Sequence, residues 1–301
     1  MLGLLSCQGH DDTAAFTWPT AHSHVTDTGA DLDVDFSALE ADLNTVFQTL
    51  RSINGQPIID VHDEVMTHTD GQCPGYTENN GSLFWYAACT SSVGTAYNGY
   101  LFYTLYDGED LFGDGNAWDA WIVTGAADVT TATGETAHFG GQAYTAHTVQ
   151  ADNDQVFLWY TGVGGSFYAD TASAQGTWLT DGGSAALQMY AATYAEYGIN
   201  IFSLQGDLSL NGSISAMHTD ALFIYTEYPG VYPCAEEPTG TLQVRTADGT
   251  WLDIAFDIDP STLDVDAGRC DGCGTVSYQS DVIGEICIDA SPLVDWKEAP
   301  W

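Results

Sequence analysis

Short apolar runs limit the possible folds of this chain more than any other feature of its sequence. Beyond residue 57, nearly every such run is rich in Tyr, Phe, Trp, Val, Ile and Thr, and ends at Gly, Asp or Asn. These side chains favour extended strands, and the tight turns between them favour antiparallel pairing. The predicted strands are residues 58–61, 83–88, 100–106, 118–124, 143–149, 156–161, 166–169, 178–179, 187–194, 199–204, 213–217 and 221–226. We therefore predict an all-β protein, built as a large antiparallel sandwich or a curled sheet.

Residues 38–53 have the pattern of one amphipathic helix. Ser37 can accept a hydrogen bond from its first turn, and Asn54-Gly55 supplies a left-handed stop. Apolar side chains recur every three to four residues along one face: Leu39, Leu43, Val46, Phe47, Leu50 and Ile53. We expect this helix to cover one face or an open end of the sheet.

Three prolines gather between residues 228 and 238 and predict a boundary there. We expect a disordered tether in residues 1–34, a helix plus antiparallel β domain in residues 35–230, and a β unit stapled by disulfides in residues 231–301.

The C-terminal β unit is predicted to contain two hairpins, which pair residues 241–246 with 251–257 and 275–279 with 282–288. If residues whose numbers sum to about 561 face each other in the second hairpin, Cys287 lies beside Gly274 and close to Cys273.

The charge of the chain excludes one class of partner. Four Lys and Arg residues stand against 42 Asp and Glu residues, which gives a formal net charge of −38 at pH 7. Such a chain cannot neutralise a row of phosphates, so we expect no nucleic-acid partner. Hydrophobic residues make up 45% of the chain, which is enough to fill a core. No segment approaches the 18 apolar residues of a transmembrane helix, so we expect no transmembrane segment.

The first residues suggest a compartment. Leu4-Leu5-Ser6-Cys7 resembles a bacterial lipobox, which implies a lipid anchor at Cys7 and an exported lipoprotein of the bacterial outer membrane or cell surface. A chance cysteine after two leucines is the alternative. The six residues before Cys7 include no basic residue and are shorter than a signal-peptide core. We therefore expect a start codon assigned too late or a trimmed N-terminus.

Six further cysteines form an even set, which in an exported chain predicts three disulfides. A turn at residues 79–81 would bring Cys73 and Cys89 together, and the second C-terminal hairpin brings Cys273 close to Cys287. Cys234 is then left for Cys270. The last four cysteines could instead close a zinc site, but a zinc ribbon needs two Cys-x-x-Cys knuckles and this chain has one.

The C-terminal part of the sequence contains the strings Cys270-Asp271-Gly272-Cys273-Gly274, Gly284-Glu285-Ile286-Cys287, Leu293-Val294-Asp295-Trp296 and Pro300-Trp301. These strings resemble a family of predicted bacterial surface lipoproteins of unknown activity. Cys73-Pro74 and Cys89, the latter followed by Gly94, resemble the central segment of the same family. The resemblance covers about a third of the chain. It implies an exported and tethered protein, and it implies no catalytic residues.

One segment is dense in oxygen ligands, and calcium prefers six to eight of them around one point. We consider it a candidate calcium site, although its order differs from that of an EF-hand and an acidic turn between strands would look the same. The candidate ligands are Asp107, Asp110, Asp114, Asn116 and Asp119.

Two other features bear on function. His62-Asp63-Glu64 with His68 is the nearest approach to a polar catalytic group, although a chance grouping near a strand end explains it as well. In residues 100–106, alternation places aromatic and apolar side chains on both faces, which predicts a strand buried between layers.

No catalytic signature such as Gly-x-Ser-x-Gly or His-Glu-x-x-His is present in the sequence. We therefore expect a non-enzymatic, surface-tethered binding or structural protein whose ligand is a glycan or a surface protein, with calcium as the one candidate cofactor. The alternative is a secreted carbohydrate-active hydrolase that uses an Asp/Glu pair in an aromatic-lined groove.

Overall fold

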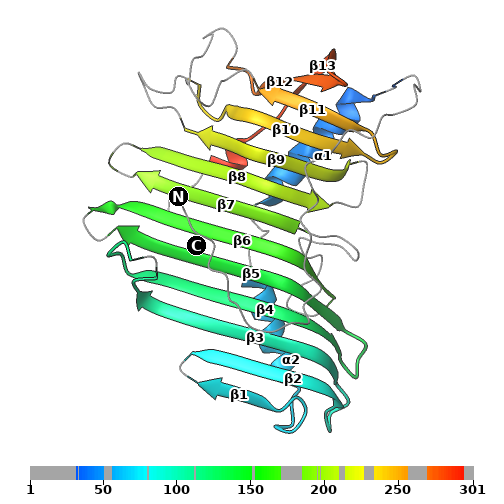
Figure 1. Cartoon of the computed structure of the whole chain (residues 1–301), viewed down its shortest axis with the longest axis vertical. Coiled ribbons are helices and arrows are strands. Elements are labelled where there is room, and N and C mark those ends of the chain that lie inside the picture. The colour runs from blue at the N-terminus through cyan, green and yellow to red at the C-terminus, as the bar shows by residue number, and fades with distance from the viewer. Residues whose placement is uncertain are drawn as a thin grey trace.

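The described residues form a 13-stranded antiparallel sheet in which each strand pairs with the next along the chain (Figure 1). The computed structural model describes residues 32, 34–50, 56–79, 81–111, 113–150, 153–170, 185–194, 196, 198–209, 214–226, 234–256 and 270–294. The strands are β1 (Tyr76–Asn79), β2 (Ser82–Thr90), β3 (Ala96–Glu109), β4 (Trp118–Thr130), β5 (Thr136–Gln150), β6 (Asn153–Asp170), β7 (Ala185–Tyr194), β8 (Ile199–Ser209), β9 (Ile214–Tyr225), β10 (Pro238–Thr246), β11 (Trp251–Phe256), β12 (Cys273–Tyr278) and β13 (Asp281–Cys287). The all-β prediction is confirmed, in its curled-sheet form.

In the part of the chain that the structure describes, three helices accompany the sheet: α1 (Phe36–Thr49), α2 (Gln56–Met66) and α3 (Ser291–Val294). Figure 1 shows α1 and α2 on the same side of the sheet, α1 behind β9–β12 and α2 behind β3 and β4. The predicted helix 38–53 corresponds to α1, which begins two residues earlier because Asp35, and not Ser37, caps it. Its predicted Asn54-Gly55 stop lies outside the described residues.

The helix α2 contradicts the strand predicted at residues 58–61. Ile58, Val61 and Val65 are buried at the three-to-four-residue spacing of a helix, and Asp60 and Asp63 on the other side are exposed. A four-residue apolar run has the same composition in a strand and in a buried helix, so its length alone could not distinguish the two.

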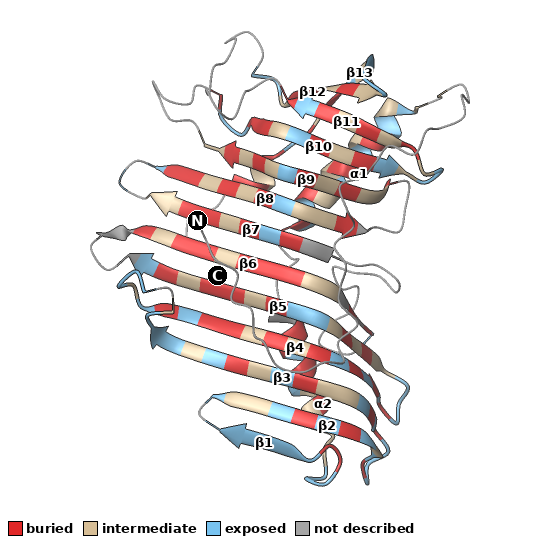
Figure 2. Cartoon of the chain, viewed as in Figure 1, coloured by how far each residue is buried: buried red, intermediate tan, exposed pale blue. Residues whose placement is uncertain are grey.

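The two faces of the sheet have different surroundings, and we call them the helix-side face and the outer face. Buried and less buried residues alternate along the strands (Figure 2). The helix-side face packs on α1 and α2 in one continuous core, to which β4 contributes Trp121, Val123, Ala127 and Val129. Among the described residues, no second sheet covers the outer face.

This arrangement corrects the prediction that residues 100–106 are buried between two layers. The predicted alternation is present, since Leu101 is fully buried on the helix-side face. Phe102, on the outer face, is 38% exposed. Two apolar faces therefore do not require two covering layers in this strand.

Strands β5 and β6 are long and bend at paired glycines. Gly141 faces Gly165, with φ of 120° and 128°. A Cβ atom at Gly165 would lie 1.9 Å from the carbonyl oxygen of Gly140. Only glycine permits this approach, so the chain can bend without leaving the sheet.

The runs predicted at 156–161 and 166–169 are both part of β6, and those at 213–217 and 221–226 fall in β9; residues 178–179 lie outside the described residues.

The C-terminal strands continue the same sheet, because β10 pairs with β9 across the predicted boundary near residues 228–238. Both predicted hairpins are present, as β10–β11 and β12–β13. In the second, Cys273 is directly opposite Cys287, one residue away from the predicted register. A β-bulge between Val276 and Ser277 shifts the register along this hairpin. The prediction assumed one constant sum for the numbers of facing residues, and a hairpin with a bulge has no such constant sum.

The disulfides agree with the prediction. The described residues contain the bridges Cys73–Cys89, Cys234–Cys270 and Cys273–Cys287. The zinc alternative for the last four cysteines is therefore wrong. Among the described residues, no helix is long and apolar enough to cross a membrane.

Candidate functional site

Aromatic rings form an open patch on the outer face at the β2–β3 end of the sheet. Cross-strand pairing places Phe84 opposite Phe102 and Tyr86 opposite Tyr100. Phe84 is 45% exposed and Tyr86 is 70% exposed. We call these four residues the ring patch. Its rings are held by adjacent strands, so they form a platform whose side chains lose little freedom when a ligand binds.

Polar side chains border the ring patch on the same face. Asn98 faces Asp128, and Asp128 in turn faces His138 across β4 and β5. His138 Nδ1 lies 2.7 Å from Asp128 Oδ1, and 61% of the Asp128 side chain is exposed. Carboxylate, amide and imidazole groups beside flat rings can exchange hydrogen bonds with ligand hydroxyls.

Farther along the outer face, one tyrosine lies over a glycine. Tyr144 faces Ile122 on β4 and Gly162 on β6. A Cβ atom at Gly162 would lie 2.1 Å from Cε1 of Tyr144, so the absence of a side chain gives the ring its place. Burial raises the pKa of Tyr144. The outer face therefore accommodates aromatic rings across β2–β6.

A second aromatic cluster lies on the outer face of β4–β7. The ring of Tyr160 lies 5.5 Å from Trp118 and 4.7 Å from Tyr190. Trp118 is only 1% exposed and packs with Leu158 in a small core separate from the helix-side core. Burial, followed by the neighbouring tyrosine Tyr194, raises the pKa of Tyr190, so its phenol stays protonated at neutral pH.

The predicted calcium loop lies beside this second cluster, and its carboxylates are engaged with the chain itself. Asp114 accepts a hydrogen bond from the indole nitrogen of Trp118 at 3.1 Å. Asp110 accepts from the backbone N–H of Asp114 at 3.0 Å, and Asp119 accepts from Gly108 at 3.0 Å.

Burial acts to raise the pKa of Asp114, but hydrogen bonds from Asn116 and Trp118 outweigh it and lower that pKa. Asp107 lies exposed near the end of β3. Within the described ranges, no three or more His, Cys, Asp or Glu side chains are grouped as a metal would require. Calcium binding by the loop stays a prediction.

The carboxyl groups give no support to the hydrolase alternative. A glycosidase general acid needs a raised pKa. Where the surroundings clearly shift a described carboxyl group, at Asp70, Asp114 and Asp248, the pKa is lowered.

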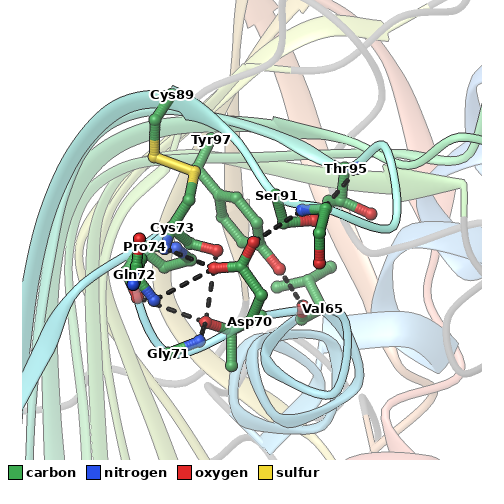
Figure 3. Close-up of a disulfide and its surroundings, with 12 residues drawn as sticks. Val65, Asp70, Gly71, Gln72, Cys73, Pro74, Cys89, Ser91, Thr95 and Tyr97 are labelled. Atoms are coloured by element: carbon green, nitrogen blue, oxygen red, sulfur yellow. Dashed lines mark hydrogen bonds between the residues drawn. A yellow bond between two sulfur atoms is a disulfide. The ribbon is translucent and has the colours of Figure 1, made fainter.

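On the helix side, a disulfide and one carboxylate attach α2 to the first strands (Figure 3). Cys73 and Cys89 are bonded, and Asp70 accepts backbone hydrogen bonds from Ser92 at 2.6 Å and from Cys73 at 2.9 Å. These bonds, together with one from Gln72, lower the pKa of Asp70 to about 2. We call this connection the Asp70 clasp.

The segment His62-Asp63-Glu64 lies on α2 and not at a strand end as predicted. His62 is 3% exposed, and its Nδ1 lies 3.1 Å from Asp63 Oδ1. The two residues line a pocket between α2 and the β1–β2 hairpin. His68 follows the C-terminus of α2 and is not among the residues that line this pocket.

Comparison with protein-family models, with curated proteins and with solved structures finds no match to this chain. The resemblance to bacterial surface lipoproteins therefore stays a prediction, and Cys7, on which the anchor depends, lies outside the described residues.

Proposed function

We propose that this chain is a non-enzymatic binding protein of a bacterial cell surface, tethered through Cys7, that binds a glycan on the outer face of its sheet. The ring patch carries the proposal, since Tyr86 is 70% exposed beside three other rings, and a contiguous exposed group of apolar rings is typical of a binding surface. Rings of this kind stack on the apolar faces of sugars, and Asn98 and Asp128 can bind the sugar hydroxyls.

The charge of the chain favours a neutral ligand over an acidic one. The formal net charge of −38 repels polyanions such as acidic polysaccharides at low ionic strength. A neutral glycan experiences no such repulsion, and its hydroxyls can donate to the many carboxylates. We therefore expect selection for neutral sugars.

A glycan array tests the ligand, run once with calcium and once with a chelator. Tyr86→Ala and Phe102→Ala should each lower the affinity for a bound neutral glycan about tenfold, which corresponds to about 1.4 kcal/mol. The matched control is Val282→Ala, because Val282 is 71% exposed at the far edge of the sheet. Binding lost in the chelator would show that glycan binding depends on calcium.

Two results would contradict the proposal. An array without any binder, or ring variants that bind as tightly as Val282→Ala, would exclude the ring patch as the glycan site. Release of reducing ends from a bound glycan would support the hydrolase alternative. The tether is tested separately: Cys7→Ala should move the protein from the membrane fraction to the soluble fraction of the cell, and an unchanged distribution would exclude a lipid anchor at Cys7.

A further inference from the structure

One edge of the sheet is open. In Figure 1, β1 is the outermost strand at the end of the sheet opposite β13, and all four of its residues are exposed. In an antiparallel edge strand, the N–H and C=O groups of alternate residues point away from the neighbouring strand. Within the described ranges, the backbone of β1 hydrogen-bonds only to β2. The outward groups of β1 can therefore pair with one further strand.

The opposite edge of the sheet is closed by a helix. Glu40 of α1 accepts a hydrogen bond from the backbone N–H of Cys287, at the end of β13, at 2.9 Å. In the part of the chain that the structure describes, no helix residue bonds to the backbone of β1 in this way. The two edges therefore differ, and β1 is the one that leaves its backbone groups accessible.

A pocket adjoins the open edge on the helix-side face. It has a volume of about 270 Å³, lies between α2 and the β1–β2 hairpin, and is lined by residues that include Asp63, Tyr76 and Glu78. Side chains of a strand added to β1 alternate between the two faces of the sheet, so every second one lies on the side of this pocket. Sheet edges that bind peptides combine these two features, because backbone bonds give affinity and pockets for alternate side chains give specificity.

The charge of the chain selects which strand is added. The formal net charge is −38, and Arg245 in β10 is the one Lys or Arg among the described residues. A second copy of the chain carries the same charge and brings another Glu78 to the edge, so repulsion opposes its addition. A basic strand is attracted by the same field, and its cationic side chains can approach the carboxylates of Glu78 and Asp63.

We propose that β1 pairs with an extended, basic segment of a partner protein, whose lysine or arginine side chains lie along the pocket. The backbone groups of β1 make the main contact, and the carboxylates select a basic segment over an acidic one. The Asp70 clasp fixes α2 to the first strands, so the edge and the pocket are formed before the partner arrives.

The probe is the capped peptide acetyl-Thr-Lys-Val-Lys-Thr-Lys-amide, whose lysines share one face when the peptide is extended. Calorimetry with the full chain measures its affinity. Amide hydrogen exchange of the same complex locates it, because the outward amides of β1 should exchange at least tenfold more slowly when the peptide is bound. The same peptide with glutamate in place of each lysine should not bind.

Two N-methylated peptides separate strand addition from simple attraction between opposite charges. One carries N-methyl groups on the three lysines and the other on the remaining three residues, so each has lost the N–H donors of one edge. The peptide that is blocked on the edge facing β1 should bind at least tenfold more weakly than the parent peptide. Attraction by the carboxylates alone would leave both affinities unchanged, since the charge of the peptide is the same.

Variants of the chain test the choice of a basic segment. Glu78→Gln should weaken peptide binding about threefold, as is usual for an exposed ion pair. Glu285→Gln is the matched control, because Glu285 is an exposed carboxylate on β13 at the other end of the sheet. Phe102→Ala should leave peptide binding unchanged even if glycan binding is lost, so the open edge and the ring patch can fail separately.

Four outcomes would overturn the proposal: no binding of the parent peptide, equal binding of the parent and both N-methylated peptides, equal binding of the glutamate peptide, or equal effects of Glu78→Gln and Glu285→Gln. Protection of the outward β1 amides without peptide, increasing with protein concentration, would also overturn it and would show that a second copy of the chain occupies the edge.

Discussion

The carboxylate of Glu40 accepts a hydrogen bond at 2.9 Å from the backbone N–H of Cys287, 247 residues later in the chain. Glu40 belongs to α1, and Cys287 ends β13, the last strand of the sheet. Asn44, one turn farther along α1, accepts a bond from the backbone N–H of Asp289 at 2.7 Å. The helix therefore satisfies backbone groups at the edge of the sheet that another strand would otherwise pair, which protects this edge from aggregation.

Removing that acceptor should destabilise the protein. Glu40→Ala leaves the N–H of Cys287 without its partner, and we expect the free energy of unfolding to fall by about 1–2 kcal/mol. Urea denaturation followed by circular dichroism measures the change. Glu40→Gln keeps an acceptor and should lose less, and Gln48→Ala, at an exposed position of the same helix, should be nearly neutral. Equal losses in Glu40→Ala and Gln48→Ala would show that the bond does not stabilise the edge.

The bend in β5 and β6 predicts an unequal response of two adjacent glycines. Gly165→Ala places a Cβ atom against the carbonyl oxygen of Gly140 at a residue with positive φ, and should lower the free energy of unfolding by at least about 2 kcal/mol. Gly164 has no atom within 4 Å of its Cβ position, so Gly164→Ala should have little effect. Thermal and urea unfolding of both variants provide the comparison, and a similar stability for the two would mean that the bend does not need glycine.

The Asp70 clasp predicts a pH dependence. Because backbone N–H donors lower the pKa of Asp70 from 3.8 to about 2 in the folded protein, its contribution is fully present above pH 3.8. The contribution decreases as the pH falls from 3.8 towards 2, when the carboxylate becomes protonated. Wild type should therefore be more stable than Asp70→Asn at pH 6, and the difference should decrease towards pH 2. Denaturation curves across this range test it, and a difference that does not change with pH would contradict it.

The bond between Asp114 and Trp118 predicts a measurable coupling in the acidic loop. In a double-mutant cycle of Asp114→Ala and Trp118→Phe, we expect a coupling free energy of about 0.5–1.5 kcal/mol in the absence of calcium. Unfolding curves of the four proteins in a chelator provide the values. A coupling near zero would indicate that the indole does not depend on this carboxylate and would leave Asp114 available for a metal.

Several features of this protein follow from the sequence by itself, because they depend on neighbours in the chain. The strands of the C-terminal hairpins end at turn residues such as Ala247-Asp248-Gly249, and short-range pairing of this kind is enough to predict that Cys273 lies close to Cys287. The buried stripe of α1 likewise follows from the spacing of Leu39, Leu43 and Phe47.

Tertiary structure decided which face of each strand is covered. Alternation in residues 100–106 produces two apolar faces, and the sequence pattern does not tell which of them is buried. The position of α2 behind β3 and β4 makes Leu101 a core residue and leaves Phe102 partly exposed. The pocket that His62 lines, between α2 and the β1–β2 hairpin, and the Glu40–Cys287 hydrogen bond also depend on tertiary structure. Each joins residues from separate elements, and a local pattern contains no information about such partners because their approach depends on how the whole sheet curls.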